Sequence, residues 1–130
     1  MSLEAAAAPH VHTIGVEPIA ERLATYRTTA IAWDALSGDP AKANKVFVDL
    51  HRMYKSLRDT EAGRMGIARL MDDSAVAVRL TAAAHSLFWS PERAERVLRA
   101  IQDDPNAGLH AVTAKYTLKE FHAGRLSHDW

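Results

Sequence analysis

The chain has 130 residues, of which 48% are apolar and 25% are charged, so its length and composition suit one globular domain. Sixteen Lys and Arg residues balance sixteen Asp and Glu residues, and this neutral total argues against a dedicated nucleic-acid binder, which usually carries a basic excess. The absence of cysteine excludes disulfides, thiolate catalysis and Cys-ligated zinc, and it fits a reducing cytoplasm, where we expect the protein to act.

No apolar run approaches the roughly 20 residues that a membrane span needs, so we expect no membrane partner. Residues 1–14 show no apolar period, and we interpret them as a flexible N-terminal tail. A single helical domain is predicted over residues 15–130.

Six segments carry apolar residues at spacings of three and four, which is typical of amphipathic helices. Capping residues followed by proline mark two of the starts, at Asp39-Pro40 and Ser90-Pro91. The predicted helices run over 18–36, from Pro40 through Leu57, over 61–71, over 74–89, from Pro91 to a stop at Asp103, and over 107–123.

The third of these helices contains Gly63 and Gly66, each of which weakens a helix by up to about 1 kcal/mol relative to alanine. Two explanations are open. The glycines allow a neighbouring element to approach closely, or this segment frays.

The helix over 74–89 differs from the others because Arg79 is its only strongly charged residue. It has one apolar stripe through Leu80 and Leu87 and a second, on nearly the opposite side, through His85 and Trp89. A helix that is apolar on two sides is buried between neighbours, so we predict that it is the central element.

Short connections imply that consecutive helices are antiparallel and form hairpins that bury their faces by stacking. Acidic caps followed by Val-Arg, small residues and leucine are typical of the inner helix of a HEAT-type repeat. We therefore predict an all-α fold, a HEAT-like right-handed superhelix of about three antiparallel helix pairs.

Several segments, which together cover most of residues 40–126, have a recognisable order. They are 78–87, 91–98, 115–121 and 124–126, with shorter similarities at 43–45 and 57–58. This ordered set resembles a bacterial family catalogued as "domain of unknown function two thousand and nineteen". The resemblance implies a HEAT-like α-superhelix in a bacterial protein and carries no established activity, so no catalytic residue follows from it. The spacing departs from the usual repeat because Leu87 comes one position late.

The second, fourth and sixth helices are expected to line one side of the stack. Their residues outside the main core would form one concave surface that mixes cations with aromatic groups, which suits an acidic protein face or a phosphate-bearing ligand. The residues predicted to bind there are Arg52, Lys55, Arg79, His85, Trp89, Tyr116 and Lys119.

Structural explanations compete with this one. His85 is explained as well by a buried histidine that hydrogen-bonds a neighbouring helix, and Trp89 by a side chain that fills core volume. Arg79 is expected to pair with an acid, for which Asp72, Asp73 and Asp104 are candidates.

Residues 42–69 hold seven cations and three acids, and we interpret them as a solvated helix face rather than a phosphate site. His10 and His12 have the spacing of a weak metal site but no third ligand nearby. No phosphate-binding, dinucleotide-binding, nucleophile-elbow or zinc-protease motif occurs, so the sequence predicts no catalytic residue, no metal and no cofactor.

The favoured function is therefore a non-enzymatic protein-binding module, in the form of a bacterial immunity or regulatory protein. The partner is another protein, and a homodimer is left open. The alternative is a small-ligand-binding or enzymatic HEAT-like protein with a pocket near His85. A deep pocket that contains His85 beside a carboxylate would favour the alternative.

Overall fold

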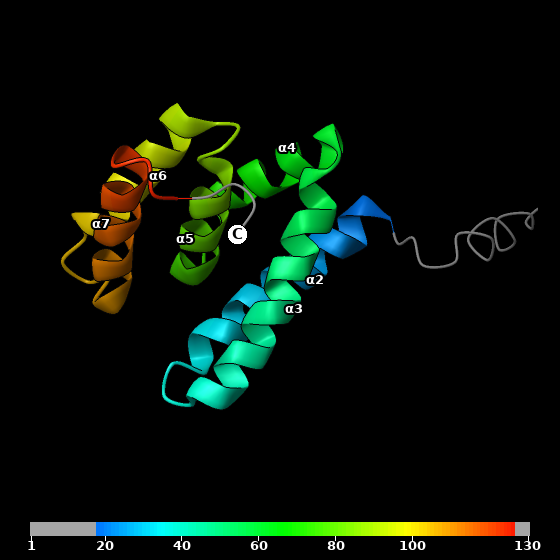
Figure 1. Ribbon diagram of the computed structural model, residues 1–130, viewed down its shortest axis with the longest axis horizontal. Coiled ribbons are helices and arrows are strands. Elements are labelled where there is room, and N and C mark those ends of the chain that lie inside the picture. The colour runs from blue at the N-terminus through cyan, green and yellow to red at the C-terminus, as the bar shows by residue number, and fades with distance from the viewer. Residues whose placement is uncertain (1–17, 127–130) are drawn as a thin grey trace, which may run out of the picture.

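The computed structural model describes residues 18–126 (Figure 1). The tail predicted over residues 1–14, including His10 and His12, lies outside the described residues. Within residues 18–126 every regular element is helical, which confirms the all-α prediction for this part of the chain. The elements are α2 (Ile19–Ala35), α3 (Pro40–Arg58), α4 (Glu61–Arg69), a 3₁₀ turn η2 (Leu70–Asp72), α5 (Val76–Ser86), α6 (Pro91–Gln102) and α7 (Leu109–His122).

Local sequence signals explain where α3 and α4 begin. The carboxylate of Asp39 accepts a hydrogen bond from the Lys42 amide at 3.3 Å, and Pro40 takes the first helical position. The hydroxyl of Thr60 accepts one from the Gly63 amide at 3.0 Å. These side chains satisfy amides that have no partner inside the helix.

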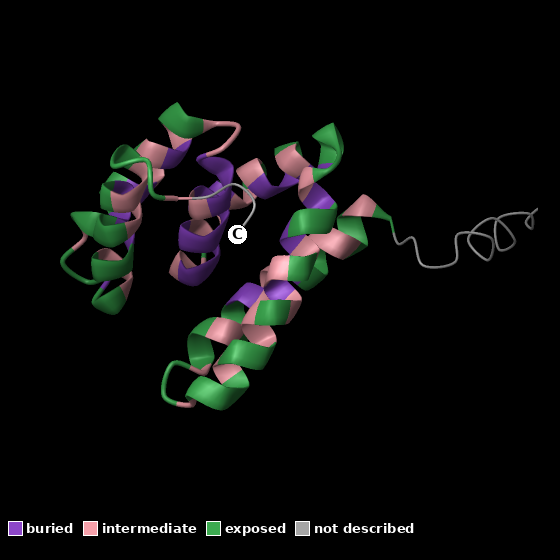
Figure 2. Ribbon diagram, in the orientation of Figure 1, coloured by how far each residue is buried: buried purple, intermediate pink, exposed green. Residues whose placement is uncertain are grey.

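Helix α5 lies at the centre of the molecule. It contacts α2, α4, α6 and α7, and Figure 1 shows it between the α6–α7 hairpin and the pair formed by α2 and α3. Eight of its eleven residues are buried, so it is the most completely buried helix in Figure 2. The prediction of a central helix is confirmed, and its bounds are shorter than the predicted 74–89.

Polar contacts at residues 73–75 explain the late start of α5. The carboxylate of Asp73 accepts two hydrogen bonds from Arg27 of α2, at 2.7 and 3.1 Å, and a third from the Ala75 amide. These hydrogen bonds hold Asp73 in an extended conformation, and the Arg27 guanidinium lowers the pKa of this carboxyl. The chain therefore enters α5 from a turn that is tied to α2.

Arg79 corrects part of a prediction. Its charge helps to lower the pKa of the Asp73 carboxyl, as an acidic partner implies, but its hydrogen bonds go to main-chain carbonyls. Its guanidinium donates to the main-chain carbonyls of Asp73 and Ser74, at 2.9 and 3.0 Å. The carboxylate of Asp73 is already bound to Arg27, so Arg79 instead satisfies carbonyls of the turn that precedes α5.

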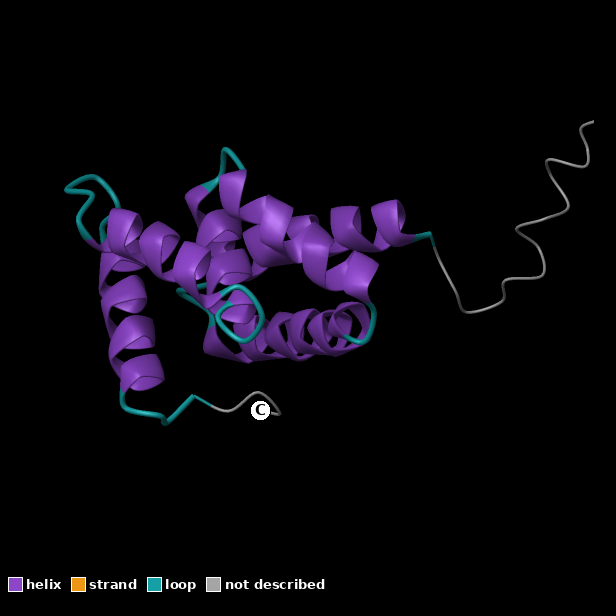
Figure 3. Ribbon diagram, turned by 90° about the horizontal axis from the view of Figure 1, so that it is seen from above, coloured by secondary structure: helices purple, strands orange, loops and turns teal. Residues whose placement is uncertain are grey.

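The two glycines of α4 allow close packing. A Cβ at Gly63 would lie 1.9 Å from the main-chain oxygen of Leu57, and one at Gly66 would lie 2.2 Å from a methyl carbon of Leu23. Both glycines are buried, so close approach rather than fraying explains them. Figure 3, viewed from above, shows the short loops that join the helices.

We predict that Gly63→Ala destabilises the protein although alanine favours helix. The main chain at Leu57 cannot move aside as a side chain can, so the overpacking cost of about 1–3 kcal/mol outweighs a propensity gain of about 1 kcal/mol. Urea unfolding measures the change. Gly38→Ala is the control, since a Cβ there meets nothing within 4 Å. Equal stability of both variants would contradict the close approach.

Candidate functional site

The residues predicted to form one concave surface lie in different environments. His85 is only 4% exposed, and Trp89 is half-buried with its indole nitrogen enclosed. Arg79 is half-buried at the start of α5, whereas Arg52 and Lys55 are exposed on α3. Tyr116 and Lys119 are exposed on α7. The open surface expected around His85 is therefore replaced by two separate features, a pocket and the outer face of α7.

His85 is held inside the molecule by two tyrosines from two other helices. Its Nδ1 is 2.7 Å from the hydroxyl of Tyr26 in α2, a hydrogen-bonding distance, and its ring stacks on Tyr54 of α3 with centroids 3.8 Å apart and planes 12° apart. This arrangement is the buried, hydrogen-bonded histidine that the structural explanation expected.

Burial keeps the imidazole of His85 neutral. Desolvation lowers its pKa from 6.5 to about 3, and electrostatic interactions with His51 and Arg58 add to the effect. At neutral pH the side chain is an uncharged aromatic group rather than a cation or a ready general acid.

A row of rings extends from His85 along α3. Tyr54 lies 6.1 Å from Trp89 and 5.9 Å from His51, and His51 stacks on Phe47 with centroids 5.9 Å apart and planes 7° apart. Phe47 in turn lies 5.4 Å from Trp33 of α2. These contacts join α2, α3 and the end of α5 through aromatic surface.

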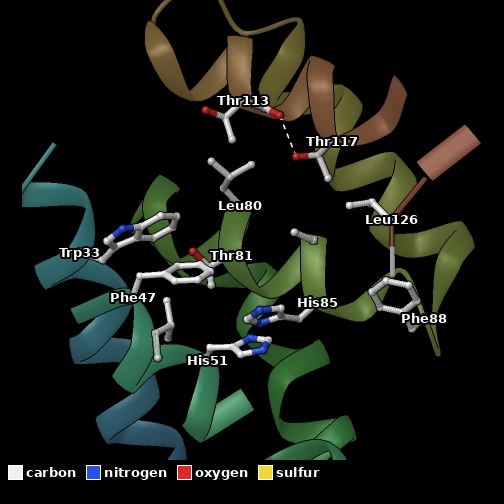
Figure 4. Close-up of a pocket in the computed structure, with 12 residues that line it drawn as sticks. Trp33, Phe47, His51, Leu80, Thr81, His85, Phe88, Thr113, Thr117 and Leu126 are labelled. Carbon is white, nitrogen blue, oxygen red and sulfur yellow. Dashed lines mark hydrogen bonds between the residues drawn. The ribbon is translucent and has the colours of Figure 1, made fainter. Parts of the chain in front are cut away.

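One side of this row forms the wall of a pocket of about 230 Å³. Helices α3, α5 and α7, predicted to lie on one side of the stack, all contribute to it, together with Trp33 of α2 and two loop residues (Figure 4). The lining residues are Trp33, Phe47, Leu50, His51, Leu80, Thr81, Ala84, His85, Phe88, Thr113, Thr117 and Leu126.

The pocket contains His85, as the alternative function required, but none of its described lining residues is a carboxylate. An acid–base pair built on His85 would need such a group beside an imidazole that can gain a proton. The pocket therefore suits binding better than catalysis.

The second feature is an apolar stripe on α7. Leu109, Val112 and Tyr116 are 78%, 47% and 54% exposed, and their spacing of three and four places them on one face. The buried residues Ala114 and Leu118 point the other way, so the stripe faces directly away from the core. Hereafter we call these three residues the α7 stripe.

The described residues offer no evident metal site and no membrane span. Across residues 18–126, no group of three or more His, Asp or Glu side chains is placed to hold a metal ion. In the same range no helix combines the length and the apolar character needed to cross a membrane.

Sequence reasoning found His85 but missed most of the pocket. Phe47 and His51 are four residues apart on the inner side of α3, and this pair was a usable signal. Thr113 and Thr117 could not be recognised as pocket residues, because no local sequence pattern shows that α7 lies opposite α3.

Comparison with known proteins adds no family and no relative: no family model matches the chain, and no curated protein or solved structure does. Residues 18–126 are known by their own geometry, as an all-helical fold with a pocket that lacks charged side chains and an exposed apolar stripe.

We predict that Tyr26→Phe costs about 1–3 kcal/mol of unfolding free energy, because it leaves a buried nitrogen of His85 without its hydrogen bond. Tyr116→Phe is the matched control, since its ring is half-exposed on α7. Urea unfolding of both variants checks the difference. Equal effects would contradict the role of the Tyr26 hydroxyl.

We also predict that stability falls as the pH drops below about 6.5. The folded protein keeps His85 neutral down to about pH 3, whereas the unfolded chain takes up a proton near pH 6.5. Protonation thus favours the unfolded state, by up to about 1.4 kcal/mol per pH unit in this window.

The measurement compares unfolding free energies at pH 7 and pH 5.5, where most carboxylates stay ionised. The wild-type chain should lose about 1 kcal/mol more than His85→Gln, which has no imidazole at this position to titrate. The lowered pKa of His51 acts in the same direction in both proteins, so it cancels in the comparison. Identical pH dependence would show that His85 is not buried as a neutral group.

Proposed function

We propose that the chain is a non-enzymatic protein-binding module and that its partner docks on the α7 stripe. The observation that carries this proposal is the exposure of three large apolar side chains, Leu109, Val112 and Tyr116, in a row opposite the core. Scattered apolar residues on a surface need no explanation, but a contiguous row on one helix is typical of an interaction site.

The charges beside the stripe favour an acidic partner. Lys115 and Lys119 are exposed on one flank, and the Lys119 ammonium lies 6.0 Å from the centre of the Tyr116 ring. This flank is the one nearer α6, because His122, seven residues from Lys115, contacts Glu95 of that helix at 2.9 Å. An amphipathic helix with an acidic edge would place its apolar face on the stripe and its carboxylates beside the lysines.

The proposal includes the HEAT-like interpretation of the fold. Helices that follow one another in the chain are in contact, as α2 and α3, α5 and α6, and α6 and α7 show, and this is compatible with a stack of hairpins. Helix α7 is the last described helix of that stack. An end of such a stack that is open to water needs a polar outer face. The α7 stripe is apolar instead, which supports the proposal that another protein covers it. We keep a bacterial immunity or regulatory protein of the cytoplasm as the proposed role, by analogy with other helical binding proteins of this fold class alone.

Of the residues predicted from sequence to bind, Tyr116 and Lys119 belong to this proposed surface. Arg52 and Lys55 lie on α3, His85 is buried, and Arg79 and Trp89 are half-buried outside this surface. The enzymatic alternative has no support, since no carboxylate lines the pocket in the described part of the chain.

The test begins with a photo-crosslinking amino acid at position 116, or at position 65 as a control, in the cells that make the protein. Met65 is 51% exposed on α4, so the two positions are matched in exposure. We expect a discrete adduct from position 116 only, and the captured protein is then purified for binding measurements.

With the purified partner, Tyr116→Ala should weaken binding at least tenfold, which corresponds to about 1.4 kcal/mol. Lys119→Glu should slow association, and its effect should shrink at high salt. Met65→Ala should bind within twofold of wild type. No adduct, the same adducts from both positions, or unchanged affinity of Tyr116→Ala would overturn the proposal. An adduct between two copies of the chain would show that the partner is a second copy, so that the α7 stripe forms a homodimer interface.

A further inference from the structure

The pocket next to His85 is a second feature of the molecule, and protein docking on α7 does not explain it. It is a cavity of about 230 Å³ built from four helices, and it lies on a different side of α7 from the α7 stripe. Thr113 and Thr117 line the pocket (Figure 4), whereas Val112 and Tyr116 are exposed to solvent on the outer face of α7. The two sites are therefore distinct.

The lining carries no formal charge near neutral pH. None of its described residues is Asp, Glu, Lys or Arg, and its most deeply buried imidazole, His85, has a pKa of about 3. Desolvation also lowers the pKa of its second imidazole, His51. A charged ligand would lose its hydration without gaining a partner of opposite charge in this lining, which is costly. An uncharged ligand avoids that cost.

The walls of the pocket favour a ligand with a flat ring. Trp33 and Phe47 present aromatic surface on one side in Figure 4, Phe88 and Leu126 stand on the other, and Leu80 lies between them. Aromatic and aliphatic walls of this kind gain dispersion and stacking energy from a planar guest. The hydroxyl of Thr81 provides a polar group within the wall.

The volume sets the size of the guest. An apolar cavity of about 150 Å³ accommodates benzene, so a cavity of 230 Å³ has room for one or two fused rings. We propose that this pocket binds a small, uncharged aromatic molecule of that size, and that a ring N–H or hydroxyl of the ligand contacts Thr81. This site is independent of the proposed docking of a protein on α7.

The experiment titrates indole into the full chain and follows amide chemical shifts by NMR. We expect saturable shifts at Thr81, Ala84 and Thr113 with a dissociation constant of about 0.1–1 mM, which is ordinary for nine heavy atoms. Indole-3-carboxylate should bind at least tenfold more weakly, because the lining has no cation to replace the hydration of its charge.

Two variants fill the pocket from different helices. Ala84→Leu adds volume from α5, and Thr113→Leu adds volume from an exposed position of α7, so at least one should fold normally. Each folded variant should reduce indole affinity at least tenfold. Ala100→Leu, on the exposed side of α6, is the matched control and should leave the affinity unchanged.

Three outcomes would overturn the proposal: no saturable binding, equal or tighter binding of the carboxylate, or unchanged affinity in the folded pocket-filling variants. A fourth concerns the chain itself, since residues 127–130 follow Leu126, which lines the pocket. If indole binds Trp130→Ala but not the wild-type chain, the occupant is the chain's own tryptophan and not a free ligand.

Discussion

The burial of α5 is the constraint on which the rest of the structure depends. This helix contacts α2, α4, α6 and α7, and small residues such as Ala82 and Ala83 let those neighbours come close. Because α5 is enclosed in this way, its polar side chains lose contact with water, and burying one is costly unless the protein supplies a partner. His85 meets this requirement with the hydroxyl of Tyr26 and the ring of Tyr54. The hydroxyl of Ser86 is buried without a hydrogen-bond partner among the described residues.

The burial of α5 also keeps charged side chains out of the interior. Ion pairs lie at the periphery of the packed helices, where Arg27 holds Asp73 before α5 and where Glu95 of α6 contacts His122 of α7. The space beside His85 is lined by uncharged groups. The molecule thus combines a neutral inner pocket with the α7 stripe, an apolar outer face beside two lysines. The proposed ligand binding and the proposed protein docking therefore use different sites.

Periodicity alone predicted the helices and the central position of α5, because a helix with two apolar stripes must have neighbours on both. It did not show which neighbours cover the second stripe. His85 and Trp89 were therefore assigned to an open surface, although Tyr26, 59 residues away in sequence, bonds to His85. Arg79 was paired with an acid because sequence could not reveal that Arg27 already holds Asp73. The pocket needed the relative placement of α3 and α7, which no local pattern encodes.

Native-state hydrogen exchange tests the central claim most directly, because it measures the free energy of opening at each amide. If α2, α4, α6 and α7 pack around α5, the amides of Ala82 and Ala83 should exchange only through global unfolding, and their opening free energy should equal the value from urea unfolding. Amides on the outer face of α7, such as that of Val112, should open at a lower free energy. The account would be contradicted if Ala82 and Ala83 exchanged clearly below the global value while another helix reached it.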